Sequence, residues 1–223
     1  MSVTVPLPPG AAIDAEGVWC QVLADVPDDR SRPALFLDRD GVVIEEIGFL
    51  ARPEDAFLVP GATAVIAEAN QHDVGIVLIT NQSGIGRGYF GWDAFIAVQQ
   101  KILADLAAMG ARVDGVFACP HHPEALPPYR HPDHPARKPN PGMLQRAQRL
   151  LRLDLASSWI VGDRAIDLEA GRNAGLAGGV LVATGFGHDT SQRAASRALA
   201  TSGFAVQVAD SIADVPALVP LLR

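Results

Sequence analysis

The chain has 223 residues, 48% of them hydrophobic, and a formal net charge of −7 at pH 7. This composition is typical of a folded globular protein, and the length allows one large domain or two small ones. The acidic balance argues against general binding to nucleic acid or to an anionic membrane, because both favour clustered lysine and arginine. We therefore expect neither kind of partner, and the sequence leaves the oligomeric state open.

Cys20 and Cys119 are the only cysteines, which are too few for a disulfide scaffold and favour a reducing compartment. Residues 1–13 have no basic segment before their apolar residues and contain three prolines, so they do not resemble a signal peptide. No stretch is long and apolar enough to predict a membrane span. We therefore expect a cytoplasmic protein.

Residues 1–33 are predicted to form an N-terminal arm that is mostly irregular, with one short helix near residues 18–24. Pro27, Asp28, Asp29 and Pro33 interrupt regular structure toward the end of this arm. A regular succession of apolar runs begins at Ala34, so residues 34–223 are predicted to form a single domain.

The apolar pattern of this domain predicts an α/β fold. Short apolar runs without period-2 alternation predict strands covered on both faces, at residues 34–37, 74–79, 113–118, 159–161, 180–183 and 205–208. Helical spacing predicts helices at residues 62–72, 92–109, 141–152, 167–176 and 191–200. Asn140 is the expected N-cap of the third helix, and Pro141 its first-turn proline. Strands that alternate with helices predict a doubly wound, mostly parallel sheet.

Polar residues follow most of the predicted strands, at the edge where such sheets bind ligands. Asp38 and Asp40 follow the first strand, and residues i and i+2 of an extended chain point to one side. Their two carboxylates therefore either lie apart in water as loop residues or hold a cation between them. The other strand-end residues are Thr80 to Ser83, Cys119 to His122, and Gly162 to Asp167, while Arg137 and Lys138 precede a helix. Taken singly, each has an ordinary explanation as a turn, a cap or a solvated side chain.

Taken in order, these residues resemble the four motifs of the haloacid dehalogenase-like phosphohydrolases. The motifs are DRDGV from Asp38, a hydroxyl residue at Thr80, a lysine before a helix at Lys138, and Gly162-Asp163 with Asp167. The segments FLDRDGVV, TNQSGIGRGYF, CPHHP, RKPNPGML and VGDRAIDLEAG further resemble the D-glycero-D-manno-heptose-1,7-bisphosphate phosphatases and the related histidinol-phosphate phosphatases. Only small insertions separate the motifs, which implies a member without a large cap domain.

The resemblance implies a Mg²⁺-dependent hydrolysis of a phosphomonoester through an aspartyl-phosphate. It assigns Asp38 as the nucleophile, Asp40 as general acid and then base, and Thr80 and Lys138 as stabilisers of the phosphoryl oxygens. The implied Mg²⁺ ligands are Asp38, the backbone carbonyl of Asp40, and Asp163. The implied substrate is a small phosphorylated sugar, foremost the heptose bisphosphate, with histidinol phosphate as the alternative. The implied substrate contacts are Glu46, Gly48, Phe49, Asn81, Gln82, Ser83, Arg87, Arg137 and Arg164; for Arg87, an exposed loop arginine is an equally good interpretation.

Many members of the resembled families hold a structural zinc ion in the loop that corresponds to residues 120–139. Their pattern is C-x-H followed by C-x-C. Here Cys119 and His121 match the first half, but His134 and Ala136 stand where the two cysteines would be. Zinc in a structural site takes four nitrogen or sulfur ligands, and Cys119, His121, His131 and His134 are the candidates. A proline-stiffened loop with free histidines is the alternative.

A non-catalytic phospho-acceptor module, like a receiver domain, is the competing class of function. It also uses strand-end carboxylates and a lysine. A pure acceptor has no need of a general acid two residues after the acceptor, so Asp40 favours an enzyme. A phosphatase acting on DNA ends is disfavoured by the absence of a basic stripe.

Overall fold

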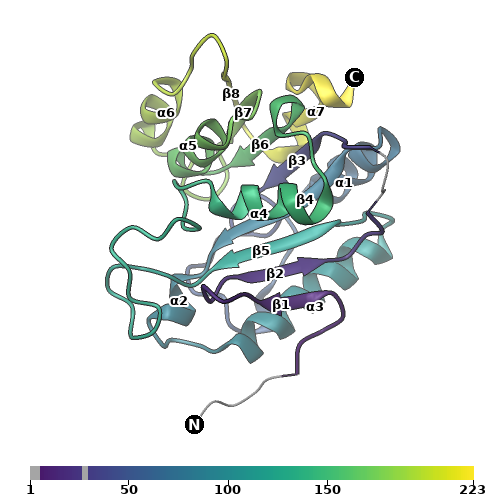
Figure 1. Ribbon diagram of the computed structural model, residues 1–223. Helices are drawn as coiled ribbons and strands as arrows, with labels where there is room; N and C mark the ends of the chain where they lie inside the picture. Colours follow the sequence, from purple (N-terminus) through teal and green to yellow (C-terminus); the bar gives the residue numbers. More distant parts are fainter. Residues whose placement is uncertain (1–5, 27–29) are drawn as a thin grey trace.

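The fold is built around one mixed sheet with helices on both of its faces (Figure 1). The computed structural model describes residues 6–26 and 30–223, so the predictions for residues 1–5 and 27–29 lie outside the described residues. The sheet has eight strands in the order β1-β2-β5-β4-β3-β6-β7-β8. They are β1 (Ala11–Ile13), β2 (Trp19–Val22), β3 (Ala34–Leu37), β4 (Gly75–Asn81), β5 (Gly115–Cys119), β6 (Trp159–Gly162), β7 (Gly178–Val182) and β8 (Ala205–Ala209).

The six strands predicted from the sequence are all present, and they pair in parallel from β5 across to β8. β1 and β2 extend this sheet in the antiparallel sense beyond β5. The mostly parallel, doubly wound α/β fold is thereby confirmed, and no large cap domain stands over the described residues.

Helices cover the sheet in two layers, α1 (Ala62–Gln71), α3 (Trp92–Ala108) and α7 (Val215–Leu218) on one face, α4 (Gly142–Leu151) and α5 (Ala165–Ala174) on the other (Figure 1). α6 (Thr190–Arg197) packs beside α5, and the single turn α2 (Ser83–Gly86) follows β4. Short 3₁₀ turns are η1 (Pro53–Asp55), η2 (Leu155–Ser157), η3 (Ile212–Asp214) and η4 (Pro220–Leu222). Among these helices, none combines the length and apolar character needed to cross a membrane.

β3 lies at the centre of the sheet and divides the core into its two layers. Leu35 and Leu37 pack with the α1 and α3 side, whereas Ala34 and Phe36 pack with the α4 and α5 side, and all four are fully buried. Each buried leucine or phenylalanine contributes about 1.5–3 kcal/mol. This anchoring fixes the chain at its next residue, Asp38, at the carboxyl end of the strand.

The prediction of a helix near residues 18–24 is wrong, because this segment forms β2. Trp19 stacks on Trp92 with ring centroids 5.7 Å apart and meets Phe95 edge-on at 5.4 Å. Cys20 packs on the opposite face of the sheet. The ladder with β5 and this two-sided burial, which the local sequence does not reveal, favour the strand over a helical turn.

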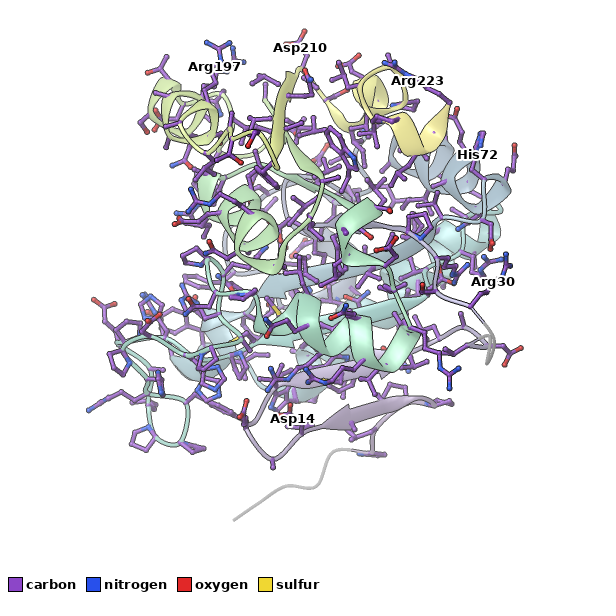
Figure 2. The ribbon with its side chains drawn as sticks, turned by 45° about the horizontal axis from the view of Figure 1, so that its top comes forward. Asp14, Arg30, His72, Arg197, Asp210 and Arg223 are labelled. Atoms are coloured by element: carbon purple, nitrogen blue, oxygen red, sulfur yellow. The ribbon has the colours of Figure 1, made fainter. Side chains whose placement is uncertain are left out.

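The arm is also tied to α4 by charge. Asp14 lies in the turn between β1 and β2 (Figure 2), where its Oδ2 accepts a hydrogen bond from Nε of Arg146 at 2.7 Å. Glu16 pairs with the same guanidinium. The described part of the arm thus belongs to the sheet and its covering helix, while the division of the chain at residue 33 stays a prediction.

Two details at the starts of helices differ from the predictions. Pro141, not Asn140, is the N-cap of α4, because the amide of Asn140 instead donates to the carbonyl of His134 and to Asp133. α5 begins at Ala165, two residues before the predicted start, because the Asp167 carboxylate accepts a hydrogen bond from the backbone N–H of Arg164 and caps the first turn.

Candidate active site

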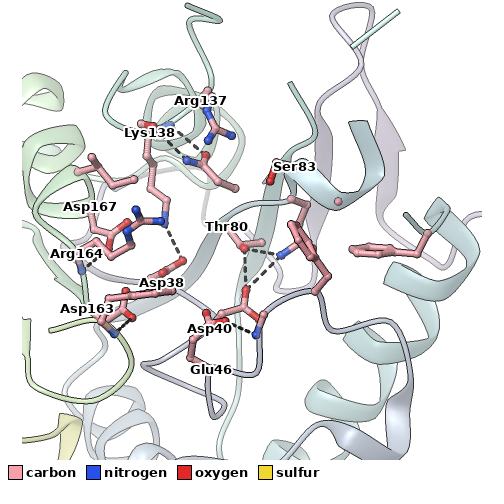
Figure 3. Close-up of a pocket in the computed structure, with 18 residues that line it drawn as sticks. Asp38, Asp40, Glu46, Thr80, Ser83, Arg137, Lys138, Asp163, Arg164 and Asp167 are labelled. Atoms are coloured by element: carbon pink, nitrogen blue, oxygen red, sulfur yellow. Dashed lines mark hydrogen bonds and ion pairs between the residues drawn. The ribbon is translucent and has the colours of Figure 1, made fainter. Parts of the chain in front are cut away.

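A pocket of about 300 Å³ opens at the carboxyl ends of β3, β4 and β6 (Figure 3). It contains every residue that the sequence assigned to catalysis, to Mg²⁺ or to substrate, with the exception of Arg87. Five further residues line it. The lining residues are Asp38, Asp40, Glu46, Gly48, Phe49, Thr80, Asn81, Gln82, Ser83, Gly84, Phe90, Arg137, Lys138, Asp163, Arg164, Ile166, Asp167 and Phe186.

Lys138 lies between two carboxylates on the floor of this pocket. Its Nζ is 2.7 Å from Oδ1 of Asp38 and 2.7 Å from Oδ1 of Asp167, and it also donates to the carbonyl of Ile79 at 3.1 Å. Burial alone would lower the pKa of Lys138, but the charges of Asp167 and Asp38 outweigh it and raise that pKa above its usual value. The ammonium group is therefore permanently charged and held in place.

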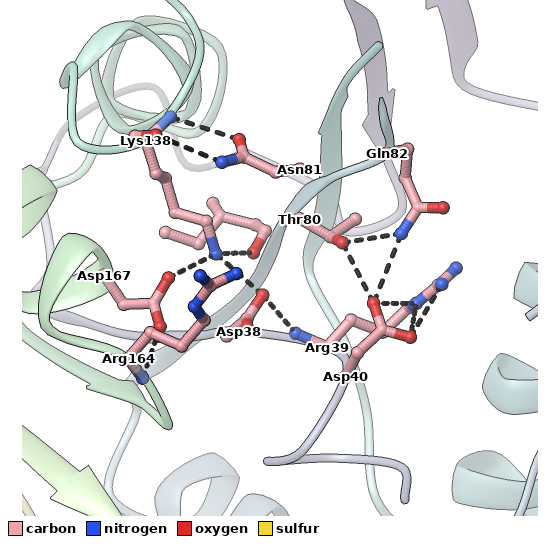
Figure 4. Close-up of polar contacts among 10 residues, drawn as sticks. Asp38, Arg39, Asp40, Thr80, Asn81, Gln82, Lys138, Arg164 and Asp167 are labelled. Atoms are coloured by element: carbon pink, nitrogen blue, oxygen red, sulfur yellow. Dashed lines mark hydrogen bonds and ion pairs between the residues drawn. The ribbon is translucent and has the colours of Figure 1, made fainter. Parts of the chain in front are cut away.

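Asn81 fixes the backbone that carries this lysine. Its Oδ1 accepts from the backbone N–H of Lys138 at 3.1 Å, and its Nδ2 donates to the carbonyl of Lys138 at 3.1 Å. This reciprocal pair joins the end of β4 to the segment before α4 (Figure 4). The side chain of Asn81 thus holds the backbone of Lys138 in position.

Three carboxylates crowd one side of the pocket, since Asp38, Asp163 and Asp167 each bring an oxygen within 4.8 Å of the others. Burial, only partly offset by Lys138, raises the pKa of Asp38 well above its usual value. Burial, followed by the charge of Asp167, raises the pKa of Asp163 to about 7. Oδ1 of Asp163 is buried without a hydrogen-bond partner in the described structure. An unsatisfied carboxylate oxygen in such a cluster fits a hard divalent cation.

This crowding predicts that Asp163→Asn stabilises the protein. Folding raises the pKa of Asp163 from 3.8 to about 7, so its ionisation lowers the folding stability as the pH rises through that range. At pH 7.5 in EDTA we expect Asp163→Asn to raise the Tm by several degrees, since each kcal/mol shifts it by about 2–4 °C. Scanning calorimetry checks this, with the exposed Asp210→Asn as the matched control. A lower Tm for Asp163→Asn would show that the carboxylates are not in conflict.

Asp40 faces away from this cluster, toward three other side chains (Figure 4). Arg39 donates from Nε to Oδ2 at 3.1 Å and from Nη2 to Oδ1 at 2.9 Å. Thr80 Oγ1 and Gln82 Nε2 each donate to Oδ2 at 3.2 Å. Arg39 is only 1% exposed, and its guanidinium lies 5.7 Å from the centroid of Phe95. Together these donors set the direction of the Asp40 carboxylate.

Two arginines, Arg137 and Arg164, also line the pocket and make up its basic wall. Arg137 donates from Nη1 to the carbonyl of His121 at 3.0 Å. Burial, and further the charges of Arg164 and Arg87, lower the pKa of Arg137. Arg164 lies with its guanidinium 4.9 Å from the ring centroid of Phe186. Guanidinium groups that repel one another beside an open cavity favour the binding of an anion between them.

Arg87 lies outside the pocket lining. Its Nη2 pairs with Oε2 of Glu124 at 2.8 Å and lies 3.1 Å from Nε2 of His122. This arrangement ties α2 to the loop after β5 and leaves the Arg87 side chain only 24% exposed, unlike a freely solvated loop arginine. A substrate contact of Arg87 stays a prediction.

The predicted zinc ligands meet in space, but not in the geometry of a zinc site. The rings of His121 and His134 stack with centroids 3.7 Å apart and an interplanar angle of 1°. Zinc lies in the plane of each imidazole that binds it, so two parallel stacked rings do not share one ion. Nδ1 of His134 accepts from the backbone of Ala136 and lies 4.0 Å from the Cys119 sulfur. Burial lowers the pKa of His134 to about 4, which keeps this stacked ring neutral. The arrangement does not fit zinc.

Comparisons with known proteins agree with this geometry. A family model described as HAD-hyrolase-like matches residues 135–215. A Mesorhizobium japonicum protein named D-glycero-beta-D-manno-heptose-1,7-bisphosphate 7-phosphatase is 47% identical over 166 residues, covering 74% of this chain and 76% of that protein.

The chain belongs to the haloacid dehalogenase-like phosphatases.

Two solved structures support the same assignment of this phosphatase. A HAD-like phosphatase from Mesorhizobium loti superposes with a TM-score of 0.81 at 40% identity and covers 93% of both chains. The D,D-heptose 1,7-bisphosphate phosphatase from B. bronchiseptica, complexed with magnesium and phosphate, gives a TM-score of 0.70 at 36% identity, covering 82% of this chain and 95% of that one. The resemblance inferred from the sequence motifs is confirmed.

Two residues with contacts to the site residues were not assigned a role by the sequence interpretation. Arg39 stands inside the DRDG motif, but its local sequence does not show that its side chain turns back to Asp40. Phe186 lies after β7, and the same strand-end rule that found the motifs, applied to this strand, would have found it.

Proposed function

We propose that this phosphatase hydrolyses one phosphate of D-glycero-D-manno-heptose 1,7-bisphosphate in the cytoplasm, with Mg²⁺ as cofactor. The observation that carries the proposal is the pairing, in one pocket, of an acidic cluster with a basic wall. Asp38 and Lys138 suit the reacting phosphate, and Arg137 and Arg164 suit a second anionic group. The similarity to proteins named as 7-phosphatases of the beta anomer supports the 7-phosphate and this anomer.

In the proposed first step, a carboxylate oxygen of Asp38 attacks phosphorus and forms an aspartyl-phosphate. The bond from phosphorus to the sugar oxygen breaks, and Asp40 donates a proton to that oxygen. Lys138 and Thr80 donate to the phosphoryl oxygens, which gather charge in the transition state.

In the second step, Asp40 accepts a proton from water as that water attacks phosphorus. The bond between phosphorus and the Asp38 oxygen breaks, releasing inorganic phosphate and restoring the carboxylate. Asp38, Asp163 and the Asp40 backbone carbonyl would hold the Mg²⁺ ion, which would supply positive charge next to the phosphate. Asp167 acts through Lys138, which it holds at 2.7 Å.

The sugar part of the substrate is expected to lie between the acidic and basic walls, near Glu46 and Phe49. Burial, and then the charge of Asp40, raise the pKa of Glu46, whose Oε1 accepts from the backbone N–H of Gly48 at 2.5 Å. The carboxylate is thereby oriented to accept from sugar hydroxyls. Phe49 meets Tyr89 edge-on, with centroids 4.7 Å apart, and gives the rim an apolar surface for the carbon face of a sugar.

A substrate panel tests the proposal. Phosphate release is measured with Mg²⁺ and then with EDTA, on both anomers of heptose 1,7-bisphosphate, histidinol phosphate and hexose bisphosphates. We expect kcat/KM for one heptose anomer to exceed that for histidinol phosphate by about tenfold to a hundredfold, because one charged hydrogen-bonded contact is worth about 1.5–3 kcal/mol. EDTA is expected to stop the reaction, and excess Mg²⁺ to restore it. A preference for histidinol phosphate would reject the proposed substrate, and activity in EDTA would reject the metal.

A further inference from the structure

The loop after β7 reaches across to the residues that follow β6. Phe186 in this loop lines the pocket, and its backbone N–H donates to Oδ2 of Asp163 at 2.8 Å. The face of its ring lies 4.9 Å from the guanidinium carbon of Arg164. Phe186 therefore contacts both Asp163 and Arg164. Its backbone N–H holds the Asp163 carboxylate, and its ring lies against the Arg164 guanidinium.

Glycines on either side fix the position of Phe186. Gly185 has a φ of +57°, and a Cβ there would lie 2.1 Å from Oδ2 of Asp163. A Cβ on Gly187 would lie 1.7 Å from the carbonyl oxygen of Val182. The backbone thus approaches Asp163 and the end of β7 as closely as glycine allows. The ring of Phe186 is placed by this tight loop and not by a core contact, since 44% of the residue is exposed.

Arg164 is an exposed residue, so its long side chain can turn away into solvent unless a contact holds it at the pocket. The negative face of an aromatic ring attracts a guanidinium and also restricts its rotamers. The Phe186 ring meets both requirements, with its centroid 4.9 Å from the guanidinium carbon of Arg164.

We propose that Phe186 is a positioning residue that holds the guanidinium of Arg164 at the pocket, ready for the anionic group remote from the reacting phosphate. The inference rests on the proposed function for its substrate. The placement of Arg164 by Phe186 does not depend on the identity of that substrate.

The kinetic test compares Phe186→Leu, which keeps the backbone N–H and apolar bulk, with Phe186→Tyr, which keeps the aromatic face. For the best bisphosphate substrate of the panel, we expect Phe186→Leu to raise KM by about threefold to tenfold with kcat nearly unchanged. Phe186→Tyr is expected to retain the original KM. Phe57→Leu, an exposed phenylalanine outside the pocket, is the matched control and should change neither parameter.

A double-mutant cycle separates positioning from general damage to the loop. If Phe186 acts through Arg164, Phe186→Leu adds nothing to the KM of an Arg164→Ala variant. Additive effects in the double variant would overturn the proposal, and so would an equal loss in Phe186→Tyr.

Crystal structures of the wild type and Phe186→Leu give a readout that does not depend on substrate. We expect Arg164 to leave its position in Phe186→Leu. An unmoved Arg164 would reject the positioning role even if the bisphosphate is the substrate. A displaced Arg164, in an enzyme that shows no preference for bisphosphates, would instead reject the proposed function.

Discussion

Asp38→Asn is expected to reduce phosphate release by about 10⁴-fold or more, because an amide does not form the aspartyl-phosphate. The fold is expected to persist. Burial raises the pKa of Asp38, and Asp167 and Asp163 raise it further, so the folded chain already disfavours this negative charge. An asparagine of the same size removes the charge and leaves the main chain of β3 untouched.

The measurement is phosphate release at saturating substrate and Mg²⁺, together with the Tm in EDTA. Asp105→Asn, which changes a partly exposed aspartate paired with Lys101 on α3, is the matched control and should keep full activity. Activity of Asp38→Asn within about tenfold of the wild type would remove Asp38 as the nucleophile. An unfolded Asp38→Asn protein would instead show that this carboxylate is needed for the structure.

Lys138→Ala is expected to lower kcat/KM by about a hundredfold to a thousandfold, the usual loss when one donor to a developing charge is removed. It is also expected to lower the stability by about 3–5 kcal/mol, because Asp38 and Asp167 then lie buried without their counter-charge. Lys138 is only 2% exposed, with both carboxylates at 2.7 Å. The stability loss should be greater at high pH, because burial raises the pKa of Asp38 and its carboxylate is ionised there.

A second substitution separates the two effects of Lys138. Adding Asp167→Asn to Lys138→Ala removes one of the two unpaired carboxylates, so we expect part of the lost Tm to return without any return of activity. Lys101→Ala, on the exposed side of α3, is the control and should affect the stability only slightly. An unchanged kcat/KM in Lys138→Ala would place this lysine outside the chemistry.

The motifs could be predicted from the sequence because each lies next to a strong local pattern. Asp38 directly follows β3 and Asp163 directly follows β6, while Thr80 lies near the end of β4, after its apolar run. In a parallel sheet, such strand ends converge at one edge whatever the lengths of the connections. The order of residue types along the chain was therefore sufficient to predict the fold and to bring the pocket residues together.

The wrong predictions concern segments whose local structure depends on residues far away in the sequence. Trp19 and Cys20 form a strand because β5 offers an open edge and α3 offers Trp92, neither of which the first 33 residues contain. Asn140 is not the N-cap of α4, because its side-chain amide donates to the carbonyl of His134 in the neighbouring loop. In both cases tertiary hydrogen bonds and packing outweigh a local preference of about 1 kcal/mol or less.

The sequence by itself determined the alternation of strands and helices and the chemistry at the strand ends, because both depend on neighbouring residues. Only the tertiary structure decided the directions of the side chains. It turned Arg39 toward Asp40, placed Phe186 beside Arg164 and stacked the rings of His121 and His134. Contacts between long side chains depend on rotamers and backbone approach over several elements at once, and no pattern along a single segment encodes them.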